Sequence, residues 1–119
     1  MMDGIRAVLL DIDGTLTDGI GGPALPGAMR AVHAIAAKIA VRFVTNGTSW
    51  SRSGIIQALQ REGMPATDDN VVTPSLMAAK ILTGRGHDRG VLIAEAGSLP
   101  DLTWFRVTPP DAAAAVLLA

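Results

Sequence analysis

The sequence predicts an α/β fold built on a parallel, Rossmann-like sheet. Short, continuously apolar runs alternate along the chain with segments whose apolar residues recur at helical spacing. The first run is at 7–10, and a second stretch at 41–44 is apolar except for Arg42; one helical segment separates them, and small polar residues follow each. A strand, helix and strand within about forty residues form a crossover unit, whose two strands are parallel. Both strands should therefore end at the same edge of the sheet.

The first strand is predicted at 7–10, because the run "AVLL" is apolar throughout, as in a parallel strand covered on both faces. A helix follows over 26–39, with Pro26 at its first position. Its buried stripe is predicted to comprise Met29, Val32, Ile35, Ala36 and Ile39.

The second strand, at 41–44, ends in the turn-forming residues Thr45, Asn46 and Gly47. A second helix is predicted from about 51 to 61, and Gly63 supplies its C-terminal stop. Its inward side chains are predicted to be Ile55, Ile56 and Leu59.

The stretch "VVTPSLMAAKIL" predicts a short apolar entry and a third helix, with Thr73 as N-cap and Pro74 at the first position. This helix should end at Gly84, and its buried side is predicted to comprise Leu76, Met77 and Ile81. A third apolar strand is predicted in 90–97, followed by a turn or a single helical turn at 97–102.

The last segment, 109–119, is ambiguous between helix and strand. Its four consecutive alanines favour a helix, whereas the run Val116-Leu117-Leu118 after two prolines suits a strand. We favour the strand for 112–118.

Composition restricts the classes of protein that this chain could be. Half of the 119 residues are hydrophobic and 18% are charged, which indicates a globular core rather than a disordered chain. The 10 basic and 11 acidic residues nearly balance, so we expect neither nucleic acid nor a membrane surface as a partner. The chain has no cysteine, which excludes thiolate catalysis, and its first residues do not form a secretory signal. We therefore expect a cytoplasmic protein.

Polar side chains follow both of the first two strands. In open α/β sheets ligands bind outside the carboxyl ends of the strands, so Asp11, Asp13, Thr45 and Asn46 should converge there. Gly14 allows the backbone to turn sharply after the first strand, which we expect to leave nearby N–H groups available to an anion.

Two carboxylates alone would repel a phosphate, so this site requires a cation. Mg²⁺ takes oxygen ligands and uses few carboxylates together with water and phosphate oxygens. With that ion present, Asp11 could attack phosphorus as a nucleophile, and Asp13 could protonate the leaving oxygen.

These residues resemble a known family. "DIDGTLTDG" and "FVTNGTS" are similar to the first and second signature motifs of the haloacid-dehalogenase-like (HAD) phosphohydrolases, and the D-x-D-G-T-L form indicates their phosphatase branch. The resemblance implies that Asp11 is the aspartyl nucleophile and Asp13 the general acid/base, and that the carboxylate of Asp11 and the backbone carbonyl of Asp13 hold Mg²⁺. It also implies that Thr45 and Asn46 bind phosphate, and we add Gly47 and Gly14 as further phosphate-binding positions.

The resemblance extends beyond the two motifs. "LPGAMRAV", "VRFVTNGTSWSRSGIIQALQREG" and "VVTPSLMAAKIL" follow in the order seen in the subgroup with a large α/β (C2-type) cap after the second motif. Within it, the chain is most similar to the phospholysine phosphohistidine inorganic pyrophosphate phosphatases. On this comparison residues 1–72 begin the core and residues 73–119 begin the cap, and the substrate is a small phosphate ester or pyrophosphate.

One departure from the family pattern affects the expected activity. The family requires a lysine on a later strand and a second acidic motif, which normally follow the cap, and none of Lys38, Lys80, Asp68 or Asp69 is a convincing substitute. We therefore expect an incomplete form of the family, with weak Mg²⁺ binding and low turnover unless another chain supplies these groups.

Two alternatives stay open. The chain could be a non-catalytic fragment of the same fold that binds phosphate or a partner, and the Thr45-Asn46-Gly47 step could be simple turn chemistry. A receiver-like phosphoacceptor domain is disfavoured, because its acceptor aspartate would follow a central strand. An open sheet edge would favour a homo-oligomer.

Overall fold

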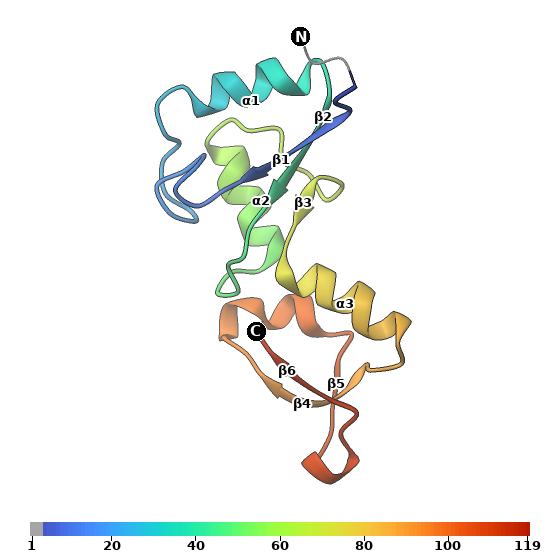
Figure 1. Ribbon diagram of the computed structural model, residues 1–119. Coiled ribbons are helices and arrows are strands. Elements are labelled where there is room, and N and C mark those ends of the chain that lie inside the picture. Colours follow the sequence, from blue (N-terminus) through green and yellow to red (C-terminus); the bar gives the residue numbers. More distant parts are fainter. Residues whose placement is uncertain (1–3) are drawn as a thin grey trace. The chain divides into compact units, whose positions relative to one another are not determined.

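The computed structural model describes residues 4–119, which divide into two compact units (Figure 1). The first unit contains the chain up to Thr45 together with Ser53–Val72, and the second contains Asn46–Arg52 and Thr73–Ala119. The strands and helices are β1 (Ala7–Asp11), α1 (Ala28–Ala36), β2 (Ala40–Val44), α2 (Arg52–Arg61), β3 (Val71–Val72), α3 (Pro74–Gly84), β4 (Arg89–Ile93), β5 (Arg106–Val107) and β6 (Ala115–Leu118). Two 3₁₀ helices complete the set, η1 (Ala96–Leu102) and η2 (Pro110–Ala112).

The first unit is a parallel sheet in the order β1-β2-β3, which confirms the predicted crossover. Ala7 pairs with Ala40 and Asp11 pairs with Val44, so the two strands end side by side. The two crossover connections, from β1 to β2 and from β2 to β3, each lead to the next strand in the same direction along the sheet. Because such connections are right-handed, α1 and α2 lie on the same face.

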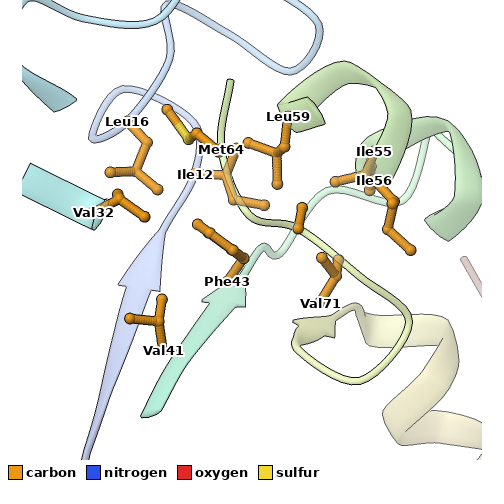
Figure 2. Close-up of a cluster of buried hydrophobic side chains, with 11 residues drawn as sticks. Ile12, Leu16, Val32, Val41, Phe43, Ile55, Ile56, Leu59, Met64 and Val71 are labelled. Atoms are coloured by element: carbon orange, nitrogen blue, oxygen red, sulfur yellow. The ribbon is translucent and has the colours of Figure 1, made fainter. Parts of the chain in front are cut away.

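The core of this unit lies between that face and the two helices (Figure 2). Phe43 of β2 is fully buried, and Ile12, Val32 of α1, Ile55 of α2 and Val71 are each 1% exposed. Burying an aliphatic or aromatic side chain of this size contributes about 1.5–3 kcal/mol. The core therefore fixes the strands whose ends carry the candidate site.

The opposite face of this sheet is exposed in the described part of the chain. Burial alternates along β1, and Leu9 is 71% exposed. The prediction that this strand is covered on both faces is therefore wrong. The run is apolar on both faces, but both helices pack against only one of them.

Helix α1 is shorter than predicted, at Ala28–Ala36 instead of 26–39. Its N-cap is Gly27, whose φ of 83° is left-handed, so the helix cannot begin at Pro26. Val32 is buried as predicted, whereas Met29 is 44% exposed. Helix α2 matches its prediction within one residue, with all three predicted inward side chains buried.

The second unit is a parallel sheet in the order β5-β4-β6, with α3 and η1 packed around Leu102, Phe105 and Leu117. The start of α3 is as predicted, because Thr73 Oγ1 accepts the N–H of Leu76 at 3.3 Å and Pro74 is the first residue.

The predicted buried side of α3 is partly wrong. Met77 and Ile81 are 42% and 46% exposed, and the small residue Ser75 is buried instead. Ala78 and Leu82, three and seven residues after Ser75, contact the core on that side.

The C-terminal segment forms a strand at Ala115–Leu118, as we favoured, after the short helix η2. The third predicted strand is confirmed as β4, although it ends at Ile93, and the predicted helical turn is η1. Strand β5, only two residues long, was not predicted. Among residues 4–119 no helix combines the length and apolarity that a bilayer crossing needs.

Candidate active site

The two acids of the first motif lie where β1 ends. Asp11 is the last residue of β1, and both Asp11 and Asp13 are exposed. Ile12 between them is 1% exposed and belongs to the core. In extended backbone, alternate side chains point to opposite sides, so burial of Ile12 turns both carboxylates outward.

A tight turn follows these acids. The carbonyl of Ile12 accepts the N–H groups of Leu16 at 2.9 Å and Thr17 at 3.1 Å, and Gly14 has a φ of 77°. The N–H of Gly14 itself donates to the Thr17 carbonyl at 2.8 Å. The expectation that this turn leaves these N–H groups available is therefore wrong, because they hold the turn together.

The same turn orients Asp11. Thr15 Oγ1 donates a hydrogen bond to Asp11 Oδ2 at 3.0 Å. This bond occupies one oxygen of the carboxylate and restricts its rotation. The sequence reasoning missed this role of Thr15, although the four-residue spacing in "DIDGT" could have indicated it.

Thr45 lies beside this acid pair in the sheet. Asp11 is in register with Val44, and Thr45 is the next residue of that chain segment. Thr45 is 4% exposed, and its N–H donates to the Val72 carbonyl at 3.2 Å. The sheet thus fixes the Thr45 backbone at the edge where Asp11 ends β1, as predicted.

Asn46 and Gly47 follow Thr45 directly and begin the segment Asn46–Arg52, which groups with the second unit. The far end of this segment contacts η1, because the N–H of Arg52 donates to Asp101 Oδ2 at 2.6 Å. Asp101 was not singled out from the sequence. Nothing local could indicate it, because 49 residues separate the two partners.

The acid pair suits a hard divalent cation. Asp11 and Asp13 offer carboxylate oxygens on one side of the chain, and no group of three or more His, Cys, Asp or Glu side chains gathers among residues 4–119. Mg²⁺ keeps several waters and is often held by one or two carboxylates plus phosphate oxygens. The residues present therefore fit Mg²⁺ better than a metal that needs a full cage of protein ligands.

Asp11, Asp13 and Thr45 lie at the carboxyl ends of two adjacent parallel strands, which is the edge where open α/β sheets commonly bind ligands. The family model described as haloacid dehalogenase-like hydrolase matches residues 8–102. The chain belongs to this family.

Curated relatives agree with this assignment. The chain is 34% identical over 109 residues to the human haloacid dehalogenase-like hydrolase domain-containing protein 2, covering 91% of the chain and 41% of that protein. It is 38% identical over 113 residues to a phospholysine phosphohistidine inorganic pyrophosphate phosphatase of Xenopus laevis, covering 92% and 42%. The chain thus spans about two-fifths of the length of these relatives.

Solved structures have the same fold. A 4-nitrophenylphosphatase from Thermotoga maritima superimposes with a TM-score of 0.80 at 25% identity, covering 98% of this chain and 45% of that one. A glycerol phosphate phosphatase from Mycobacterium tuberculosis, in complex with magnesium, gives 0.70 at 24% identity, with coverages of 96% and 35%.

Proposed function

We propose that this chain carries the nucleophile half of a Mg²⁺-dependent phosphohydrolase that works through an aspartyl-phosphate. The observation that carries the proposal is the parallel register of β1 and β2, in which Asp11 pairs with Val44 and Thr45 comes next. Relatives and similar structures named as phosphatases support it.

The chemistry follows from two carboxylates in separate roles. An oxygen of Asp11 attacks phosphorus, the bond from phosphorus to the leaving oxygen breaks, and Asp13 donates its proton to that oxygen. Asp13 then takes a proton from water, whose oxygen attacks the phosphorus and releases phosphate from Asp11. Mg²⁺, held by the carboxylate of Asp11 and the backbone carbonyl of Asp13, would supply the positive charge that lets an anion approach.

Phosphate binding is assigned to the second strand end. Thr45 would supply its hydroxyl, and Asn46 and Gly47 would supply amide groups of the segment that follows. Gly14 would contribute through its turn conformation, since its N–H is engaged with Thr17.

We propose a small phosphate ester or pyrophosphate as substrate. One relative is named for phospholysine, phosphohistidine and inorganic pyrophosphate, and one similar structure is named for 4-nitrophenyl phosphate. In this scheme residues 1–72 begin the catalytic core and residues 73–119 begin the cap. A cytoplasmic location stays a prediction from the cysteine-free composition.

The test is hydrolysis of p-nitrophenyl phosphate with and without Mg²⁺. We expect low but Mg²⁺-dependent turnover, lost in Asp11→Asn and slowed at least about a hundredfold in Asp13→Asn, because general acid–base groups typically contribute about 10²–10⁴-fold. Asp111→Asn, at an exposed acid of η2, is the control and should retain the wild-type rate. Equal rates for wild type and Asp11→Asn would remove Asp11 as the nucleophile.

The second candidate is phosphate binding without turnover. It is favoured by the observation that, within residues 4–119, no third His, Cys, Asp or Glu side chain gathers with the acid pair into a group that could hold a metal ion. Binding of inorganic phosphate by a chain that hydrolyses nothing would select it over the enzyme.

We also propose that the chain associates with a second copy through β1. The carbonyl of Arg6 accepts the Ala40 N–H. The backbone N–H and C=O groups of the alternate residues Ala7, Leu9 and Asp11 therefore point away from β2. In residues 4–119, β1 pairs only with β2. An antiparallel second copy centred on Leu9 would satisfy these outward groups in both chains.

A further inference from the structure

The segment Asn46–Arg52 contains the amides that we propose bind phosphate, and its conformation depends on the elements that contact it. It groups with the second unit, not with the sheet it leaves. Within that unit the short helix η1 approaches it closely at two places, one near its middle and one at its end.

The first contact is between backbones. A Cβ atom built on Gly97 would lie 1.9 Å from the carbonyl oxygen of Ser49 and 3.6 Å from the Cα of Trp50. Real Cβ atoms do not approach backbone atoms so closely, so only glycine permits η1 to lie this near the segment. The contact is steric and fixes the distance between the two backbones.

The second contact is a charge-assisted hydrogen bond. Asp101 Oδ2 accepts the N–H of Arg52, the first residue of α2, at 2.6 Å. N–H groups at the start of a helix have no partner within the helix and carry partial positive charge, so a carboxylate there is favourable. Asp101 therefore holds the end of the segment at Arg52, although 49 residues separate the two partners.

Helix η1 is itself firmly held. Ser98 is fully buried, and its hydroxyl donates to the Glu95 carbonyl at 2.9 Å. Leu102, at the end of η1, is 2% exposed in the core of the second unit. Thr48 also borders a cavity of about 70 Å³ with Leu102. A rigid element thus contacts the middle and the end of the segment.

We infer that η1 is a positioning element for phosphate binding, with Gly97 and Asp101 setting the conformation in which Asn46 and Gly47 present their amides. The inference rests on the proposed function of those two residues. It gives the proposed cap a second role, because part of it shapes the loop that binds phosphate. Asp101 and Gly97 touch no substrate in this scheme and act only through residues 46–52.

The test is a titration of the ¹⁵N-labelled full chain with inorganic phosphate in the presence of Mg²⁺, observed through the amide signals of Asn46 and Gly47. Four variants are compared with the wild type: Asp101→Ala, Asp101→Asn, Gly97→Ala and Asp111→Ala. Asp101→Asn keeps an oxygen that can accept the Arg52 N–H, and Asp111 is the matched acid outside η1.

Asp101→Ala should weaken phosphate binding about three- to tenfold, the size of a lost side-chain bond to a helix-start N–H, and Gly97→Ala should also weaken it, because its Cβ would clash with the Ser49 carbonyl. Asp101→Asn should recover most of the affinity, and Asp111→Ala should match the wild type. Unchanged affinity and unchanged amide shifts in Asp101→Ala would overturn the positioning role alone. A wild-type chain whose amides do not respond to phosphate would overturn the proposed function, and the positioning role with it.

A variant that fails to fold does not prevent the test. In the wild type, the Arg52 amide hydrogen should exchange with deuterium at least about tenfold more slowly than that of an unprotected amide, because it is hydrogen-bonded to Asp101. Exchange of that amide at the unprotected rate would also overturn the inference.

Discussion

At the scale of single residues, the site depends on one buried side chain between two exposed ones. Ile12 enters the core, and this places Asp11 and Asp13 on the solvent side of the same extended segment. The turn after them closes on the carbonyl of Ile12. Core packing and site geometry therefore depend on the same residue, so a substitution of Ile12 would affect both.

The hydrogen bond from Thr15 to Asp11 predicts a measurable effect on metal binding. Thr15→Val keeps the side-chain shape and removes the donor that holds Asp11 Oδ2. A typical hydrogen bond contributes about 0.5–1.5 kcal/mol, so Mn²⁺, used as a probe for Mg²⁺, should bind about two- to tenfold more weakly by calorimetric titration. Thr15→Ser retains the hydroxyl and should bind like the wild type. Identical affinities for the valine and serine variants would contradict this role.

The sequence predicts some of these residues and not others. That Asp11 and Thr45 meet at one edge follows from the strand, helix and strand order, because a crossover forces parallel pairing. The engagement of the Gly14 N–H within its own turn could not be read from the residue types. Asp101 could not be found either, since its partner Arg52 is distant in the sequence.

At the scale of elements, helices cover one face of each sheet in residues 4–119, and Leu9 and Leu118 are exposed on the other face. This explains why the order of elements is predicted well and the burial poorly. Leu9 and Val116 are apolar residues in strands that the sequence assigns correctly, yet they are 71% and 67% exposed. Periodicity shows which residues share a face, but not whether another layer covers that face.

Strand β4 provides a test of how the second sheet is held together. A Cβ built on Gly90 would lie 1.8 Å from the carbonyl oxygen of Ala115 in β6, and Gly90 has a φ of 151°. Gly90→Ala should therefore lower the free energy of unfolding by about 2 kcal/mol or more, measured by urea denaturation.

Gly84 in α3 is the matched control for this variant, because its Cβ would meet nothing within 4 Å. Gly84→Ala should leave stability unchanged or raise it by up to about 1 kcal/mol, since alanine favours the helix. Equal stabilities for the two alanine variants would contradict the close approach of β4 and β6.

At the scale of the whole molecule, the unpaired edge of β1 predicts how two copies would meet. The chain contains no cysteine, so Leu9→Cys introduces a single thiol. In an antiparallel pair centred on residue 9, the two Cα atoms would be about 5.5 Å apart, within the range that a disulfide spans. Under mild oxidation this variant should form a covalent dimer on non-reducing gels.

Ala31→Cys, at an exposed position of α1, is the control for random collision between thiols. It should cross-link much more slowly than Leu9→Cys at the same protein concentration. Equal cross-linking rates for the two variants would contradict pairing through β1. Sedimentation of the wild-type protein as a monomer would contradict it as well.

All the strand pairs in residues 4–119 are parallel, and this also governs how the chain reaches its native state. No tight hairpin can start either sheet, because Ala7 must find Ala40 and Gly90 must find Ala115. Long loops have to close before the first ladder bond forms, and proteins dominated by such distant contacts fold slowly. During that delay the apolar strands are exposed to other chains, so refolding yield should fall as protein concentration rises.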